Sequence, residues 1–230
     1  MMELSRANEG HGAGAVAAHR SPQQRRSQAA YERMMAAARR LTSDRNFDAI
    51  SIRDLAAAGQ CSIGSFYYRF GTKEAFFDLL IEDMVERRKI GVAQTLRDNP
   101  IDRLPEALAR GALENHRAHA GLLRSVIKKH LEGDLKWDRV SAMGRYAIVQ
   151  FRAAVEADRG APLSELQQER VTFAFVWLYG LLAHSILGLN TIFGMETMFF
   201  EEEAVQAFKQ AIEHALSDDP STAPAGLRMI

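Results

Sequence analysis

Residues 62–76, SIGSFYYRFGTKEAF, carry hydroxyl, phenol and cationic groups at a spacing that suits one short helix. On a helix that turns by roughly 100° per residue, Phe66 and Phe70 share one face. The opposite face holds Gly64, Ser65 and Tyr68. A solvated helix surface normally carries lysine and glutamate, whereas this face carries small, uncharged groups. The chemistry it offers is hydrogen bonding with a partner whose backbone comes close to the helix.

Two short helices joined by a tight turn position these groups, an arrangement typical of a helix-turn-helix, which binds double-stranded DNA. Ser51 is the predicted N-cap of the first helix, residues 52–58, with Asp54 three residues later as in a capping box. Ser62 is the predicted N-cap of the second helix, residues 63–69. Phosphate contacts are expected from the side chains of Arg53, Tyr67, Arg69 and Lys73 and from the helix N-termini at Ser51 and Ser62. The groups expected to contact base edges are Ile63, Gly64, Ser65 and Tyr68.

The charge is distributed unevenly along the chain, although the 230 residues have a formal net charge of zero. Residues 20–73 hold ten basic and four acidic side chains, whereas residues 74–230 hold 18 basic and 23 acidic ones. This split favours a head that binds a polyanion and a body that repels it, with chance clustering on solvated faces as the alternative. The N-terminus shows no basic-then-apolar signal pattern, which favours the cytoplasm.

Helical periodicity runs through the rest of the chain and alternating strand patterns are absent, so we expect an all-α fold. A first amphipathic helix around Tyr31 and Met34 is expected to end near Asp44, with Asn46 as a left-handed cap. Further helices are expected at residues 73–98, 104–119, 122–131, 135–157, 163–190 and 201–216. The expected domains are a disordered basic tail (1–26), a three-helix helix-turn-helix domain (27–73), a larger helical sensor and dimerisation domain (74–217) and a disordered tail (218–230). The tail arginines could contact DNA or only keep the segment solvated.

The segment from Phe47 to Leu80, FDAISIRDLAAAGQCSIGSFYYRFGTKEAFFDLL, resembles the DNA-binding domain of the tetracycline-repressor (TetR) family. The positions in register with the family pattern are Ser51, Arg53, Asp54, Leu55, Ala56, Ser62, Gly64, Ser65, Phe66, Tyr67, Phe70, Thr72, Lys73 and Glu74. One departure lies in the turn, where Gln60 occupies the position at which the family usually has a glycine with positive φ. The resemblance implies a homodimer that sets two recognition helices into successive major grooves of a near-palindromic operator.

Residues 171–195, VTFAFVWLYGLLAHSILGLNTIFGM, contain no charge over 25 positions. A membrane span is one interpretation of this length. Against it, Trp177 and Tyr179 lie well inside the run, and His184 and Asn190 are polar. The resemblance implies instead that the last two long helices form a four-helix bundle between two subunits. A helix buried on both sides needs apolar residues nearly all round.

The middle helices are expected to form the sensor for a small-molecule effector. Aromatic and apolar side chains interrupted by a few polar groups are typical of ligand pockets, and ordinary core packing is the alternative. The candidate ligand-binding residues are Asn115, His119, Trp137, Met143, Tyr146, Phe151 and Trp177. The seven histidines show no metal-binding spacing, so neither a metal nor another cofactor is expected.

The sequence therefore predicts a ligand-responsive transcriptional regulator, a repressor released from DNA by its effector. The alternatives are an activator or membrane-anchored regulator and a helical enzyme. The enzyme is disfavoured because no nucleophile motif, phosphate-binding glycine loop or paired-carboxylate signature is present. Cys61, the one cysteine, is interpreted as a small buried hydrophobe, with a thiol switch as the alternative.

Overall fold

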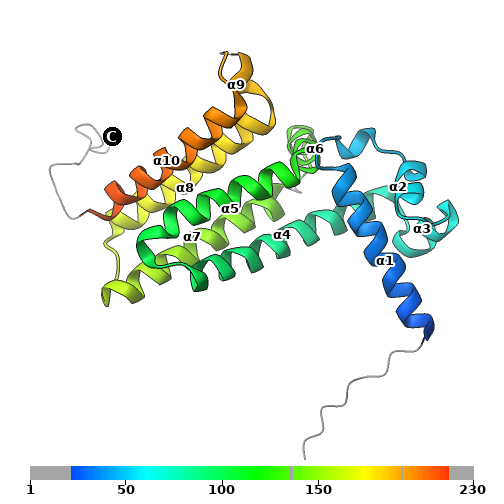
Figure 1. Ribbon diagram of the computed structural model, residues 1–230, viewed down its shortest axis with the longest axis horizontal. Coiled ribbons are helices and arrows are strands. Elements are labelled where there is room, and N and C mark those ends of the chain that lie inside the picture. Colours follow the sequence, from blue (N-terminus) through cyan, green and yellow to red (C-terminus); the bar gives the residue numbers. More distant parts are fainter. Residues whose placement is uncertain (1–21, 135–136, 193, 218–230) are drawn as a thin grey trace, which may run out of the picture.

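The computed structural model describes residues 22–134, 137–192 and 194–217, and within these ranges all regular structure is helical, which confirms the all-α prediction. The helices are α1 (Pro22–Leu41), α2 (Ile52–Ala58), α3 (Ile63–Phe70), α4 (Lys73–Asp98), α5 (Leu104–Ala118), α6 (Ala120–Leu131), α7 (Trp137–Arg159), α8 (Glu165–Ile186), α9 (Leu189–Ile192) and α10 (Thr197–Leu216), with 3-10 turns at Phe47–Ala49 and Ile101–Arg103. Helices α1, α2 and α3 form a head at one end of an elongated bundle (Figure 1).

The core of the head is built on phenylalanines. Phe66 and Phe70 of α3 pack on Phe76 at the start of α4, with ring centroids 5.1 and 4.5 Å from it. Phe47 packs on the next residue of α4, Phe77, at 4.8 Å. The first turn of α4 is thus part of the head, because burying these rings removes a large apolar area from water.

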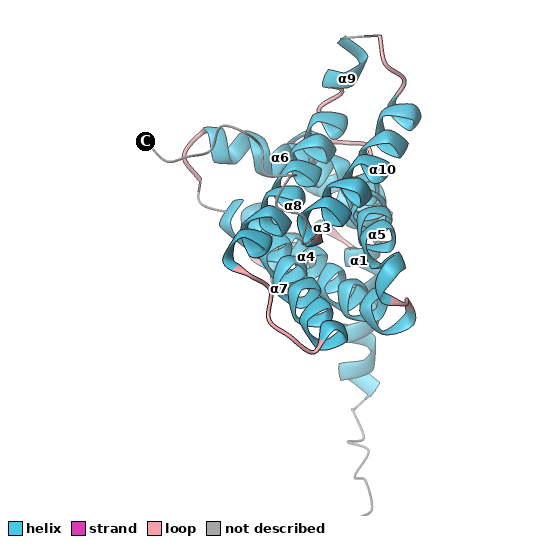
Figure 2. Ribbon diagram, turned by 90° about the vertical axis from the view of Figure 1, so that its left-hand side faces the viewer, coloured by secondary structure: helices cyan, strands magenta, loops and turns pink. Residues whose placement is uncertain are grey.

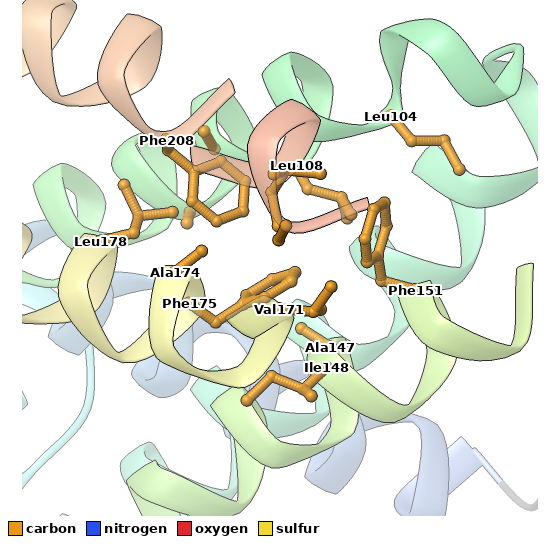
Figure 3. Packing of buried hydrophobic residues seen from close by; sticks show 14 of the residues in the cluster. Leu104, Leu108, Ala147, Ile148, Phe151, Val171, Ala174, Phe175, Leu178 and Phe208 are labelled. Carbon is orange, nitrogen blue, oxygen red and sulfur yellow. The ribbon is translucent and has the colours of Figure 1, made fainter. Parts of the chain in front are cut away.

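The core of the body lies among α5, α7, α8 and α10 (Figure 3). Phe175 of α8 is at its centre, with ring centroids 5.7 Å from Phe151 of α7 and 5.0 Å from Phe208 of α10. Figure 2 views the bundle from one end and shows these helices grouped together.

Two elements join head and body. Helix α4 runs from the head core at Phe76 to the body core at Val92 without a break. Helix α6 docks on the head, where the backbone N–H of Gly121 donates to the carbonyl of Thr42 at 2.9 Å. A Cβ at position 121 would lie 2.0 Å from the carbonyl oxygen of Arg45, so this close approach requires glycine.

Three sequence-based expectations are corrected at helix ends. The proposed disordered tail (1–26) is too long, because α1 already begins at Pro22; residues 1–21 and 218–230 lie outside the described residues. The helix expected at 163–190 ends at Ile186, because Gly188 adopts φ +72° and breaks it. Asn46 is not left-handed, since its φ is −59° and it precedes the Phe47–Ala49 turn.

In the described parts of the chain, no helix combines the length and apolar character needed to cross a membrane. The uncharged run that raised this possibility is divided between α8, α9 and the start of the connection to α10.

Candidate nucleic-acid interface

Helix α3 presents to solvent the face that the helical spacing predicts. Phe66 is fully buried and Phe70 nearly so, whereas Tyr68 is 91% exposed. Gly64 and Ile63 are exposed beside it, and Ser65 is half-buried. The outward face of α3 is therefore an uncharged strip on which nothing in the described parts of the chain packs closely.

Both short helices begin at serine N-caps. The hydroxyl of Ser51 accepts a hydrogen bond from the backbone N–H of Asp54 at 3.1 Å, and the Asp54 carboxylate accepts one in return from the N–H of Ser51 at 3.0 Å. The hydroxyl of Ser62 accepts from the N–H of Ser65 at 3.1 Å. Their remaining N-terminal N–H groups are available to an anion such as a phosphate.

The four side chains expected to contact phosphates differ in their exposure and in whether other groups of the protein already bind them. Arg53 and Tyr67 are exposed. Lys73 instead donates to the carbonyl of Asp48 at 3.1 Å and lies over the Phe47 ring, 5.0 Å from its centroid. This lysine therefore connects the start of α4 to the 3-10 turn at Phe47–Ala49.

Arg69 is half-buried and lies near Cys61, which is also only partly exposed. Burial raises the pKa of the Cys61 thiol, and the nearby charges of Arg69 and Arg33 oppose that rise. Nε and Nη1 of Arg69 are buried and make no hydrogen bond in the described parts of the chain, whereas Lys73 is held by the Asp48 carbonyl and the Phe47 ring.

The turn between α2 and α3 contains the strain that the sequence indicates. Gln60 has φ 53°, the left-handed region that glycine adopts more easily. Gly59 lies against α1, where a Cβ would be 2.8 Å from the sulfur of Met34. The missing side chain at 59 lets α2 and α1 approach closely and sets the turn that carries α3.

A second candidate site is a cavity of about 390 Å³ enclosed by α5, α6, α7 and α8. Its lining is largely apolar, and the residues are His116, Leu123, Trp137, Val140, Ser141, Met143, Gly144, Arg145, Ile148, Val176, Tyr179, Gly180, Ala183 and Ile186. A cavity of this size and character suits a small apolar ligand.

Two polar groups of the cavity, His116 and Tyr179, are uncharged at neutral pH. Burial lowers the pKa of His116 to about 4, and its ring nitrogen Nδ1 lies 2.8 Å from the carbonyl oxygen of Ala112. Burial raises the pKa of Tyr179, whose ring stacks on His116 with centroids 5.9 Å apart. The ring of Tyr179 fits because position 144 is glycine, whose built Cβ would lie 3.1 Å from it.

The seven residues expected to bind ligand do not share one site. Trp137 and Met143 line the cavity. Asn115 contacts the sulfur of Met143 at 3.8 Å but lies on a groove between α4 and α5, and His119 is buried with Nδ1 2.9 Å from the Asn115 carbonyl.

The remaining three candidates lie elsewhere: Phe151 and Tyr146 belong to the body core, and Trp177 is on the exposed side of α8. No local pattern in the sequence marks His116 and Tyr179 as cavity residues. Only the helix crossings bring those two side chains together.

The outer side of α8 carries a row of exposed apolar side chains, Leu166, Phe173, Val176 and Trp177. By contrast, the exposed side of α10 beyond its first turn is mostly polar, with Glu203, Gln210 and Glu213. Of the two helices expected to form a dimer core, α8 therefore has the more apolar outer face.

Comparison with known proteins agrees with these features. Residues 34–80 match the family model described as bacterial regulatory proteins, tetR family. Searching the curated proteins finds no match to the chain.

Among solved structures, a tetR-family transcriptional regulator from Streptomyces coelicolor aligns with a TM-score of 0.62 at 14% identity, over 85% of each chain. PfmR, a TetR-family regulator from Thermus thermophilus, aligns with 0.52 at 20% identity, over 79% of this chain and 95% of its own. A TetR-like regulator from a Rhodococcus species aligns with 0.52 at 16% identity, over 83% of this chain and 97% of its own. At these identities the alignments establish the shared fold.

Proposed function

We propose that this chain, a DNA-binding transcriptional regulator of the tetR family, is a dimeric repressor released from its operator by a small molecule bound in the body. The observation that carries the DNA-binding part is the orientation of α3. Its phenylalanines are buried and its uncharged face, around the 91%-exposed Tyr68, is open. A helix with such a face can enter the major groove without an acidic side chain in the way.

The phosphate contacts follow from the position of the face. The N-termini of α2 and α3, capped by Ser51 and Ser62, lie beside it and present N–H groups to the backbone of the duplex. Arg53 and Tyr67 extend the positive and hydrogen-bonding surface. In the proposed complex these groups set the register, and Gly64, Ser65 and Tyr68 approach the base edges.

The proposed dimer uses the outer face of α8. Phe173 is 71% and Val176 60% exposed, which is an apolar area that water disfavours. A second copy packed on this face would bury both and would place two α3 helices on one duplex. Half-sites about 34–36 Å apart would then suit a near-palindromic operator.

The proposed effector site is the cavity among α5, α6, α7 and α8. Leu123, Val140 and Met143 line it and also belong to the hydrophobic cluster of the head. In the proposed mechanism, a ligand that fills the cavity displaces these three side chains, which also pack against the head. Such displacement alters the distance between the two α3 helices of a dimer, and a few kcal/mol of differential binding is enough to shift the population.

The test of DNA binding is a gel-shift titration with DNA that flanks the gene encoding this chain. Tyr68→Ala is expected to weaken specific binding by about 10- to 100-fold, the range of one lost base contact. Leu131→Ala is the matched control, because it removes an apolar side chain that is 82% exposed on α6. Equal binding by Tyr68→Ala and wild type would refute the proposed interface.

Two further measurements test the dimer and the effector. Phe173→Glu is expected to give monomers in sedimentation velocity, whereas Leu131→Glu leaves the dimer intact. Gly144→Leu places a side chain in the lining of the cavity, where its Cβ would lie 3.1 Å from the Tyr179 ring and displace it, and is expected to abolish the ligand-induced release of DNA with little change in DNA affinity. A monomeric wild type, or an unchanged effector response in Gly144→Leu, would contradict the corresponding part of the proposal.

A further inference from the structure

Arg88 of α4 is a buried cation whose hydrogen-bond partners, within the residues that the structure describes, are uncharged. It is 5% exposed, and its Nη2 donates to the backbone carbonyl of Leu108 at 3.0 Å. Its other polar neighbour is the hydroxyl of Tyr179, and Nε has no hydrogen-bond partner. The charge of Glu114 attracts the Arg88 guanidinium from a distance. In the described parts of the chain, the two side chains form no ion pair.

The guanidinium faces a groove of about 460 Å³ between α4 and α5. Glycines of both helices line the groove beside it. A Cβ built at Gly111 of α5 would lie 2.8 Å from Nη1 of Arg88, and one built at Gly91 of α4 would lie 4.0 Å from it. A side chain at 111 would displace the guanidinium, so Gly111 lets Nη1 pack closely against α5, and Gly91 places no side chain on the α4 side of the groove.

An unpaired buried charge is costly, because the protein replaces neither its hydration nor its counter-ion. A carboxylate offers what is missing here, since its two oxygens accept the parallel N–H groups of a guanidinium. In the described parts of the chain, no carboxylate forms an ion pair with Arg88. The groove is open enough for a carboxylate to come from outside.

The rim of the groove restricts which anion fits. Arg87 also lines it, but its charge is engaged by Asp83, whose carboxylate lies 2.9 Å from Nε. Asp98 and Glu114 line the groove too and add negative charge. A dianion would be repelled by both acids, whereas a single carboxylate that reaches the inner end between the glycines meets mainly Arg88.

We propose that the groove between α4 and α5 binds a small monocarboxylate, held by Arg88 at the part of the groove lined by Gly91 and Gly111. This site is separate from the apolar cavity, although Tyr179 contacts Arg88 and lines that cavity. A carboxylate on Arg88 would also tie α4, which enters the head, to α5 of the body. The proposal concerns binding alone and does not depend on DNA recognition.

The experiment uses the full chain and benzoate as the probe, with benzamide as the uncharged analogue of the same shape. Binding is followed by calorimetric titration and by the rise in melting temperature that mass action requires. We expect benzoate to bind and stabilise the wild type, and benzamide and inorganic phosphate to do so at least tenfold more weakly.

Three variants locate the binding. Arg88→Met is expected to weaken benzoate binding at least tenfold, and Arg87→Met, on the same rim, to leave it within twofold. Gly111→Ala keeps every charge but displaces the guanidinium, so it is expected to weaken benzoate binding even if Arg88→Met does not fold. Equal affinity for benzoate and benzamide, or unchanged benzoate affinity in Arg88→Met or Gly111→Ala, would overturn the proposal.

Discussion

Adding one methyl group to α3, by Gly64→Ala, is expected to raise the stability of the protein and weaken its binding to DNA. Gly64 is exposed in the first turn of α3, and a Cβ built there meets only the hydroxyl of Ser62, at 3.9 Å. Nothing in the described part of the fold therefore resists the methyl group. Alanine is the better helix former by about 1 kcal/mol in a helix interior and by less in a first turn.

The expected gain in the free energy of unfolding is therefore about 0.5 kcal/mol, which corresponds to a rise of about 1–2 °C in melting temperature for a chain of this size. In the proposed complex with DNA, the same methyl group would occupy the space through which α3 approaches the base edges. Losing that approach is expected to lower specific affinity by about 10- to 100-fold, as for one good base contact.

The assays are urea denaturation for stability and fluorescence anisotropy with an operator duplex for affinity, both at one salt concentration. Leu131→Ala is the control for exposed substitutions outside the head. Wild-type DNA affinity in a Gly64→Ala protein that is at least as stable as wild type would show that this face of α3 is not the one that meets DNA. Reduced stability would show that the surroundings of Gly64 are more crowded than the structure has them.

Three further outcomes follow from buried groups. Because the pKa of His116 falls from 6.5 to about 4 on folding, the unfolded state binds the extra proton, so stability is lost as the pH falls from 6.5 toward 4. The free energy of unfolding is expected to fall by about 2 kcal/mol from pH 7 to pH 5 because of this one group. In His116→Gln, the free energy of unfolding measured in urea should depend less on pH over that range. Arg117→Met removes the cation paired with the buried Glu201 carboxylate and should lower the free energy of unfolding in urea by about 2–3 kcal/mol. Arg110→Met, which removes one side of an exposed ion pair, should lower it clearly less. Equal losses in the two variants would contradict this reasoning. Since burial raises the pKa of Cys61, its alkylation by iodoacetamide near neutral pH should be slower than that of the unfolded chain, and an equal rate would instead favour a reactive thiol.

Local signals in the sequence were enough to predict the head. The bounds of α2 and α4 and the serine caps of α2 and α3 agree with the prediction, because each depends on residues within a few positions of one another. The buried side of α3 follows from helical spacing alone, once Phe66 and Phe70 are recognised as its apolar face.

Interactions between distant residues decided the rest. Lys73 was expected at a phosphate, but the backbone brings the Asp48 carbonyl and the Phe47 ring within its reach. The break after Ile186 was missed because an unbroken apolar run gives no sign of where Gly188 turns left-handed.

The sequence by itself determined the all-helical architecture, the helix-turn-helix and the direction in which α3 faces, since these depend on periodicity and caps along one segment. Only the tertiary structure decided which side chains surround the cavity and that Arg88 is buried without an ion pair in the described parts of the chain. His116 and Tyr179 lie 63 positions apart in the chain, and Arg88 meets Gly111 across two helices. Helix crossing angles set such meetings, and packing over the whole core determines those angles.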